Sequence, residues 1–173
     1  MKSSILKSLA VISYCWFATL PAYALKADRE QPIEINADSM VAEEPKGFSH
    51  YKGNVQISQG SLRVEADEVI IYFIDGALNK LIIKGQPAHL QQLPENNQEP
   101  VFSKANLMEY YATTDQLFLI ENAEVKQGDN LFSGEHIEYD TRNSTVSAKS
   151  NGKQSGRVQA IIVPQKKVDT ETP

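Results

Sequence analysis

The stretch "GNVQISQGSLRVEADEVIIYF", residues 53–73, alternates apolar and polar side chains but slips by one position in its middle. Its apolar side chains are Val55, Ile57, Leu62, Val64 and Ala66 before the slip, and Val69, Ile71 and Phe73 after it. A period of two is typical of β-strands with one buried face. A slip would turn every later side chain to the opposite face unless a bulge or corner resets the backbone. We therefore expect strands that bend once and keep their apolar face inward.

The slip falls at Ala66 and Asp67, a small residue followed by one that tolerates tight local geometry. The same apolar-x-apolar-x-Ala-Asp pattern occurs in "IEINADSM", residues 33–40, and a weaker copy occurs in "VFSKANLMEY", residues 101–110. We interpret these sites as the corners of bent strands, with one extra residue at each corner.

The chain also repeats itself at an offset of 68 residues. This offset aligns "NVQISQG" (54–60) with "NAEVKQG" (122–128) without a gap and places Ala66 on Gly134. The predicted corner residues are Ala37, Ala66, Ala105 and Gly134. Two halves of similar build are expected, each made of two units.

Polar turns separate the alternating segments, and no segment carries a sustained helical stripe of apolar residues. This organisation predicts an all-β roll or barrel. The inward set expected from the alternation is Ile33, Ile35, Val55, Ile57, Leu62, Val64, Val69, Ile71, Phe73, Leu81, Ile83, Leu90, Met108, Tyr110, Leu117, Leu119, Val125, Phe132, Ile137 and Tyr139.

The first residues have the features of a secretory signal peptide. Lysines accompany a short apolar run, and "AYA" at 22–24 is an Ala-x-Ala cleavage site. We expect residues 1–24 to be removed, a single domain over residues 25–164, and a disordered polar tail over residues 165–173.

Composition excludes several classes of function. Removal of residues 1–24 takes away two lysines and the single cysteine, leaving 15 Lys and Arg against 22 Asp and Glu, a net charge of −7. A chain without cysteine has no disulfides and depends on a hydrophobic core. An acidic balance argues against nucleic acid as a partner, because phosphate binding needs clustered cations.

No catalytic or metal constellation stands out. His136 lies in "GEHIEYD" with Glu135 and Glu138, but His136 and Glu138 share the polar strand face and Glu135 lies at the corner. A solvated or structural role for His136 is favoured over a metal site. We expect no enzymatic activity, no cofactor and no metal.

Several landmarks together carry a family resemblance: "QPIEINAD", "GNVQISQGSLRVEADEV", "ANLMEY", "ENAEVKQGDNLFSGEHIEY" and "VQAIIVP". With their order and spacing, the chain from about Gln31 to Pro164 resembles the periplasmic lipopolysaccharide-transport proteins of the LptA/OstA type. The resemblance implies a twisted antiparallel β-jellyroll, open along one side, whose interior holds the acyl chains of lipid A.

The resemblance also implies partners. It predicts a bridge between the inner and outer membranes, docked to an LptC-like inner-membrane-anchored protein at one end and to an LptD-like outer-membrane translocon at the other. Head-to-tail self-association would extend the bridge. The predicted strand-pairing edges are Ile33 and Ile35 at the first strand, and Val158, Ala160 and Ile162 at the last.

The lipid-contacting residues expected on this interpretation belong to the inward set. They are Ile33, Ile35, Val64, Val69, Ile71, Phe73, Leu90, Met108, Tyr110, Leu117 and Leu119. The plainer alternative, that the central members only fill a core, has about equal weight. Arg63, Lys80 and Lys84 could touch phosphates or sugars, although solvated strand-face charges are the favoured interpretation. A carbohydrate-binding or purely structural β-jellyroll module remains the alternative function.

Overall fold

The computed structural model describes residues 30–94, 99–143, 145–150 and 157–163. These residues form ten β-strands and one short 3-10 helix: β1 (Glu34–Asn36), β2 (Ser39–Glu43), η2 (Glu44–Lys46), β3 (Phe48–Gln59), β4 (Leu62–Ile74), β5 (Ala77–Gln92), β6 (Val101–Tyr111), β7 (Gln116–Gln127), β8 (Asn130–Asp140), β9 (Thr145–Lys149) and β10 (Gln159–Ile161). The predicted signal peptide and the predicted tail lie outside the described residues.

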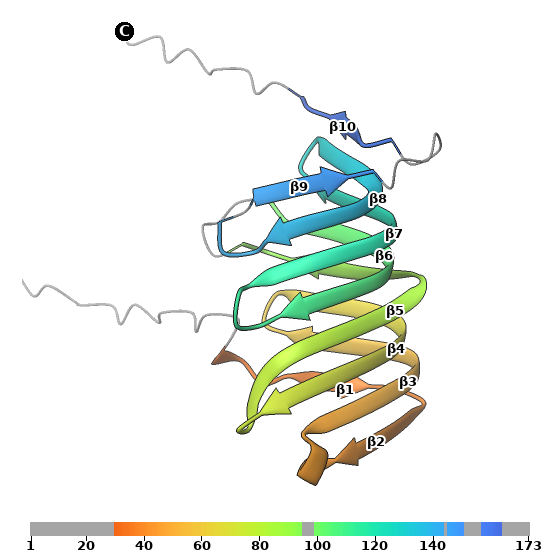
Figure 1. Cartoon of the computed structure of the whole chain (residues 1–173), viewed down its shortest axis with the longest axis vertical. Coiled ribbons are helices and arrows are strands. Elements are labelled where there is room, and N and C mark those ends of the chain that lie inside the picture. The colour runs from red at the N-terminus through yellow and green to blue at the C-terminus, as the bar shows by residue number, and fades with distance from the viewer. Residues whose placement is uncertain (1–29, 95–98, 144, 151–156, 164–173) are drawn as a thin grey trace, which may run out of the picture.

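All the strands belong to one antiparallel sheet in the order β1-β3-β4-β5-β6-β7-β8-β10, with β2 beside β3 and β9 beside β8. Figure 1 shows them stacked along the long axis of the molecule, with the N-terminal strands at one end and the C-terminal strands at the other. β1 pairs with residues 56–58 of β3 and β2 pairs with residues 48–52, so together they act as one bent edge strand. β9 and β10 divide β8 in the same way.

A line of register shifts crosses the sheet where the corners were predicted. Between the pairs Lys52–Glu68 and Val55–Ala66, β3 holds two residues whereas β4 holds one. β5 and β7 carry the other extra residues, at 85–87 and 121–122. The predicted corners are therefore confirmed in place, but the extra residue was assigned to the wrong strand. The extra residue lies on the strand that pairs with each Ala-Asp site. On β3, for example, Gly53 and Asn54 stand opposite the single residue Asp67, with φ values of 82° and 43°.

The apolar face stays inward through each corner. Ala66 and Val69 are three residues apart on β4, yet both pack in the core, so the parity change predicted from the sequence is confirmed. Small residues occupy the corner itself, where the two arms of each strand converge: Ala66, Ala88, Ala105, Ala123 and Gly134.

One row of cross-strand partners forms the centre of the core. Val69, Ile83, Met108, Leu119 and Ile137 are consecutive partners from β4 to β8. All five are completely buried. We call this the central row. Burial of a large aliphatic side chain contributes about 1.5–3 kcal/mol, so this row is a main source of stability in a chain without disulfides.

Polar partners cover much of the outer face. Lys80 pairs with Glu109, Lys104 pairs with Glu124, and Lys84 and His50 both contact Glu68. Hydrogen bonds from Lys84 and His50 hold the pKa of Glu68 below its ordinary value. These charges alternate with the inward apolar residues along each strand, as a sheet with one buried face requires.

The predicted all-β antiparallel fold is confirmed, and the sheet is open because its first and last strands each have one neighbour. The polar segment "EPK", residues 44–46, forms the short 3-10 turn η2. Gly47 ends this turn with a φ of 62°, a left-handed conformation that glycine adopts at little cost. Within the described ranges, no helix has the length and apolarity needed to cross a membrane.

We expect Leu119→Ala to lower the free energy of unfolding by about 2–5 kcal/mol, because it leaves a cavity in the central row. Urea denaturation followed by circular dichroism would measure the change. Lys126→Ala, on an exposed outer-face position of the same strand, is the control and should change stability by less than about 0.5 kcal/mol. Equal stability of the two variants would contradict the assignment of the central row as the core.

Candidate functional site

The interior of the bent sheet is the first candidate site, and its centre is closed. Six of the eleven predicted lipid-contacting residues are buried by the protein itself: Val64, Val69, Ile71, Met108, Leu117 and Leu119. In this conformation their side chains fill the space between the two arms of the sheet. Contact between a ligand and these residues therefore requires the arms to separate.

The other five predicted residues lie nearer to solvent. Ile33 and Phe73 are 51% and 38% exposed. Ile35, Leu90 and Tyr110 are half-buried and pack against the core. The interior thus combines a closed centre with apolar side chains that remain accessible toward its margins.

Both ends of the stack carry exposed apolar side chains. At the N-terminal end, Ile33, Met40 and Val41 are exposed on or beside β1 and β2. At the C-terminal end, the exposed side chains on and around β10 are Val158, Ile161, Ile162 and Val163. Both ends also present strands that have a neighbour on one side only.

The predicted edge residues fall on these strands. Ile35 pairs with Ile57 of β3 and Ala160 pairs with Phe132 of β8. Their other sides face no strand among the residues that the structure describes. β2, which sequence reasoning did not include, extends the N-terminal edge past the corner.

The three cations considered as ligand contacts are engaged within the protein. Lys80 Nζ lies 3.1 Å from a carboxylate oxygen of Glu109 and 4.7 Å from the centre of the Tyr111 ring. Lys84 bonds Glu68 at 3.1 Å. Arg63 donates to the carbonyl oxygens of Gly60 and Leu62. These contacts favour the solvated strand-face interpretation.

The surroundings of His136 favour a structural role over a metal site. Its ring lies 5.8 Å from the ring of Phe118 on the outer face. Among the residues that the structure covers, no group of three His, Cys, Asp or Glu side chains is arranged to hold a metal ion.

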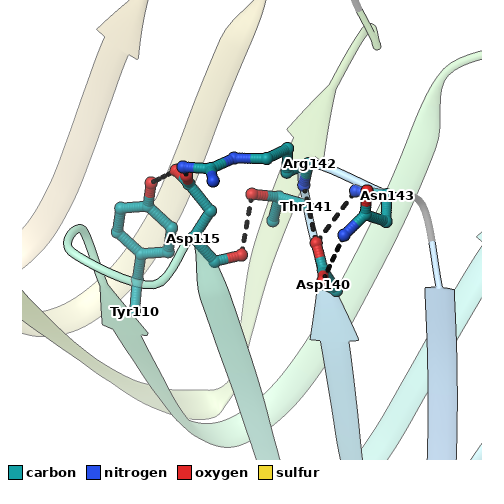
Figure 2. A network of polar contacts seen from close by, with 6 residues as sticks. All are labelled: Tyr110, Asp115, Asp140, Thr141, Arg142 and Asn143. Carbon is teal, nitrogen blue, oxygen red and sulfur yellow. Dashed lines mark hydrogen bonds and ion pairs between the residues drawn. The ribbon is translucent and has the colours of Figure 1, made fainter.

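A buried carboxylate that sequence reasoning missed joins two turns at the margin of the interior (Figure 2). Asp115, between β6 and β7, is 1% exposed. Its carboxylate accepts a hydrogen bond from the Tyr110 hydroxyl at 3.0 Å and pairs with the Arg142 guanidinium. Its carbonyl oxygen accepts from the backbone N–H and the hydroxyl of Thr141, at 2.9 Å and 3.0 Å. We call Tyr110, Asp115, Thr141 and Arg142 the Asp115 clamp.

The turn that supplies Arg142 is itself held by a carboxylate. The Asp140 carboxylate accepts hydrogen bonds from the backbone N–H groups of Arg142 and Asn143, at 3.0 Å and 2.9 Å. It also accepts one from the Asn143 side-chain amide at 2.9 Å. The hydrogen bonds from Asn143 hold the pKa of Asp140 below its ordinary value. The clamp therefore connects two ordered turns and closes the margin beside Tyr110.

No pattern in the sequence pointed to this clamp. "DTRN" and "TTDQ" look like ordinary polar turns, and nothing in either stretch indicates that its residues meet the other. Asp115 adopts a φ of 55°, which Asp tolerates better than most residues because its side chain bonds locally.

Residues 34–145 match the family described as "LptA/(LptD N-terminal domain) LPS transport protein". The chain is 33% identical to the lipopolysaccharide export system protein LptH of Pseudomonas aeruginosa over 152 residues, 84% of this chain and 87% of that protein. It is 30% identical to LptA of Escherichia coli K12 over 164 residues, covering 94% and 87% of the two chains. It is 34% identical to LptA of Haemophilus influenzae over 150 residues, covering 85% and 86%.

A solved structure shows the same fold. The crystal structure of P. aeruginosa LptH, described as the LptA-homologous periplasmic component of the conserved lipopolysaccharide transport device, superimposes with a TM-score of 0.72. The sequence identity is 31%, and the match covers 79% of this chain and 99% of LptH.

We expect Asp115→Ala to destabilise the protein by about 1–3 kcal/mol, because it removes the buried acceptor of Tyr110 and Arg142. Asp115→Asn is the matched control. It keeps an oxygen for Tyr110 and a residue that tolerates the left-handed backbone, and it should cost less than half as much. Urea denaturation would measure both variants, and an alanine variant as stable as the wild type would show that the clamp does not hold the turns.

Proposed function

Since this chain belongs to the LptA/(LptD N-terminal domain) LPS transport protein family, we propose that it is a periplasmic carrier that holds the acyl chains of lipopolysaccharide in its interior. The family consists of transport proteins, in agreement with the expectation of no enzymatic activity. Membership in it also favours the carrier over a carbohydrate-binding or purely structural module.

The observation that carries the proposal is the continuity of the apolar interior along the stack. The central row continues outward to Tyr51 and Met40 in the N-terminal direction and to Ala148 in the C-terminal direction. Met40, at the edge, is 55% exposed. An apolar track that is closed in its middle and exposed at its N-terminal edge suits a molecule that receives and passes on acyl chains.

The energetics of an apolar track suit a relay. Moving an acyl chain from water into the interior gains about 0.8 kcal/mol per methylene group. Moving it from a membrane into the interior changes the free energy little, because both environments are apolar. A carrier with this property shields the lipid from water without holding it so tightly that release is blocked.

The charge of the protein favours binding through the chains. The part of the chain after residue 24 carries a net charge of −7, whereas the head group of lipopolysaccharide is anionic. Lys80 and Lys84 are paired with carboxylates. We infer that the head groups stay toward solvent.

The predicted contact residues divide into two groups on this proposal. The residues that contact the acyl chains at the accessible margins are Ile33, Ile35, Phe73 and Leu90. Tyr110 belongs to the Asp115 clamp, so a chain reaches it from the interior side. Val64, Val69, Ile71, Met108, Leu117 and Leu119 form the floor that the chains reach as the arms separate.

The two exposed edges support head-to-tail assembly. β10 is antiparallel to β8 and β1 is antiparallel to β3, and the strands alternate in direction between them. β10 of one copy would therefore pair antiparallel with β1 of the next copy, and β9 would face β2. Contacts of this kind propagate into a filament, and main-chain hydrogen bonds supply the adhesion.

We propose that the same edges dock the protein at the two membranes. An LptC-like inner-membrane-anchored protein would pair with one end, and an LptD-like outer-membrane translocon with the other. A bridge of sheets with aligned apolar interiors would give the lipid one continuous path.

Photo-crosslinking tests the carrier function directly. A photoreactive residue at Ile35 or Leu90 should crosslink to lipopolysaccharide, because both side chains face the interior. Asn36 and Gln91, the next residues on the same strands, face outward and should give background signal. Equal crosslinking from both faces, or none from the interior, would contradict the proposal.

Proline at the C-terminal edge tests the assembly. Of Ala160 and Ile161, one directs its N–H toward β8 and the other toward the free edge, because N–H groups alternate along a strand. One proline variant should therefore abolish concentration-dependent self-association in sedimentation velocity while leaving the thermal midpoint unchanged. A wild-type protein that stays monomeric at high concentration would contradict head-to-tail pairing.

A further inference from the structure

The Asp115 clamp has a counterpart in the first half of the chain that is built from different side chains. The offset of 68 residues that aligns the two halves also relates the four clamp positions to four earlier ones. The pairs are Ala42 with Tyr110, Gly47 with Asp115, Phe73 with Thr141, and Ile74 with Arg142.

The backbone at the two sets of positions is alike. Phe73 N–H donates to the Gly47 carbonyl oxygen at 2.7 Å, and Thr141 N–H donates to the Asp115 carbonyl oxygen at 2.9 Å. Gly47 and Asp115 adopt φ values of 62° and 55°. The two margins thus share one main-chain arrangement, and what differs between them is the side chains.

Ala42 and Gly47 have smaller side chains than their counterparts Tyr110 and Asp115, and an open cleft lies beside them in the first half. The cleft has a volume of about 640 Å³ and lies between η2 and the β4–β5 turn, with Ala42, Gly47, Phe73 and Ile74 all in its walls. We call it the N-terminal cleft. Ala42 is exposed and Gly47 is half-buried, whereas their counterparts Tyr110 and Asp115 are half-buried and 1% exposed. The margin is therefore open in one half and closed in the other.

The N-terminal cleft reaches the core at its inner end. Ser49 lines the cleft, is buried, and is the cross-strand partner of the core residue Ile71. The volume of the N-terminal cleft falls within the range of about 300–1,000 Å³ that is typical of small-molecule sites. An apolar chain lying in the cleft would run from solvent onto the floor of the interior.

The charges around the cleft exclude a phosphate as its occupant. Glu44 and Asp75 contribute carboxylates to the walls, and the lysine among the lining residues, Lys46, pairs with Glu43. An anionic head group would be repelled there, whereas an uncharged hydrocarbon chain would pack against Phe73, Ile74 and Pro45.

We propose that the N-terminal cleft is a lateral opening that admits an acyl chain of lipopolysaccharide to the interior, while the Asp115 clamp keeps the equivalent opening in the second half closed. This inference rests on the proposed carrier function and adds the place where the chain passes. It assigns different roles to two halves that share one backbone.

A matched pair of photo-crosslinking positions tests the cleft. Glu44 lines the cleft, and Ala112 is its counterpart 68 residues later, in the turn that ends at Asp115. Leu90, inside the sheet, reports the carrier function itself. After incubation of the purified full-length protein with lipopolysaccharide, we expect strong crosslinks from Glu44 and Leu90 and background signal from Ala112.

Side-chain exchange between the halves tests the cause of the asymmetry. Ala42→Tyr fills the cleft and should reduce the Glu44 crosslink on the order of tenfold, the effect of displacing two methylene groups. Tyr110→Ala should raise the Ala112 crosslink. Ile74→Arg changes an exposed position, so it narrows the mouth of the cleft without changing the core. It should reduce the Glu44 crosslink too, and it takes the place of Ala42→Tyr if that variant fails to fold.

The outcomes separate the two proposals. Equal signals from Glu44 and Ala112, with a crosslink from Leu90, would overturn the cleft and leave the carrier function intact. No crosslink from Leu90 would overturn the carrier function, and the cleft with it. A Glu44 product that contains phospholipid from mixed vesicles in place of lipid A would overturn the assigned occupant.

Discussion

Every long strand turns a corner, and the burial of the core follows from how the sheet accommodates these corners. A strand that changes parity without a compensating shift would expose its apolar face. Here the extra residues on β3, β5 and β7 restore the pairing beyond the corner. Small side chains such as Ala88 and Ala105 let the two arms approach each other. The two arms of the one sheet can then cover the central row between them.

A bent sheet of this kind differs from a closed barrel in how it ends. A barrel has no free edge, because its last strand pairs with its first. In this sheet β1 and β10 lie at opposite ends of the stack, and the apolar interior meets solvent at each. The same geometry that stabilises the monomer therefore leaves two open edges, and the proposed assembly would use both. Stability and the proposed assembly thus have a common structural origin.

The internal repeat gives two halves with one backbone and different margins. Position 47 is glycine and position 115 is aspartate, and both adopt the left-handed conformation that ends the turn. The carboxylate of Asp115 bonds Tyr110 and Arg142, whereas Gly47 has no side chain that can do so. On the proposal above, a few side-chain differences on one backbone close one margin and leave the other open.

Alternation along the chain was enough to locate the strands, the inward face and the corners, because it is a local pattern, and the ordered landmarks carried the resemblance to the family. The folded arrangement was needed to tell which inward residues are sealed, as Val69 and Leu119 are, and which remain accessible, as Ile33 and Phe73 are. It also placed the extra residue on the strand beside each Ala-Asp site, and it brought Asp115 to Arg142. These features depend on register between strands, and register is a relation between distant segments that no single segment encodes.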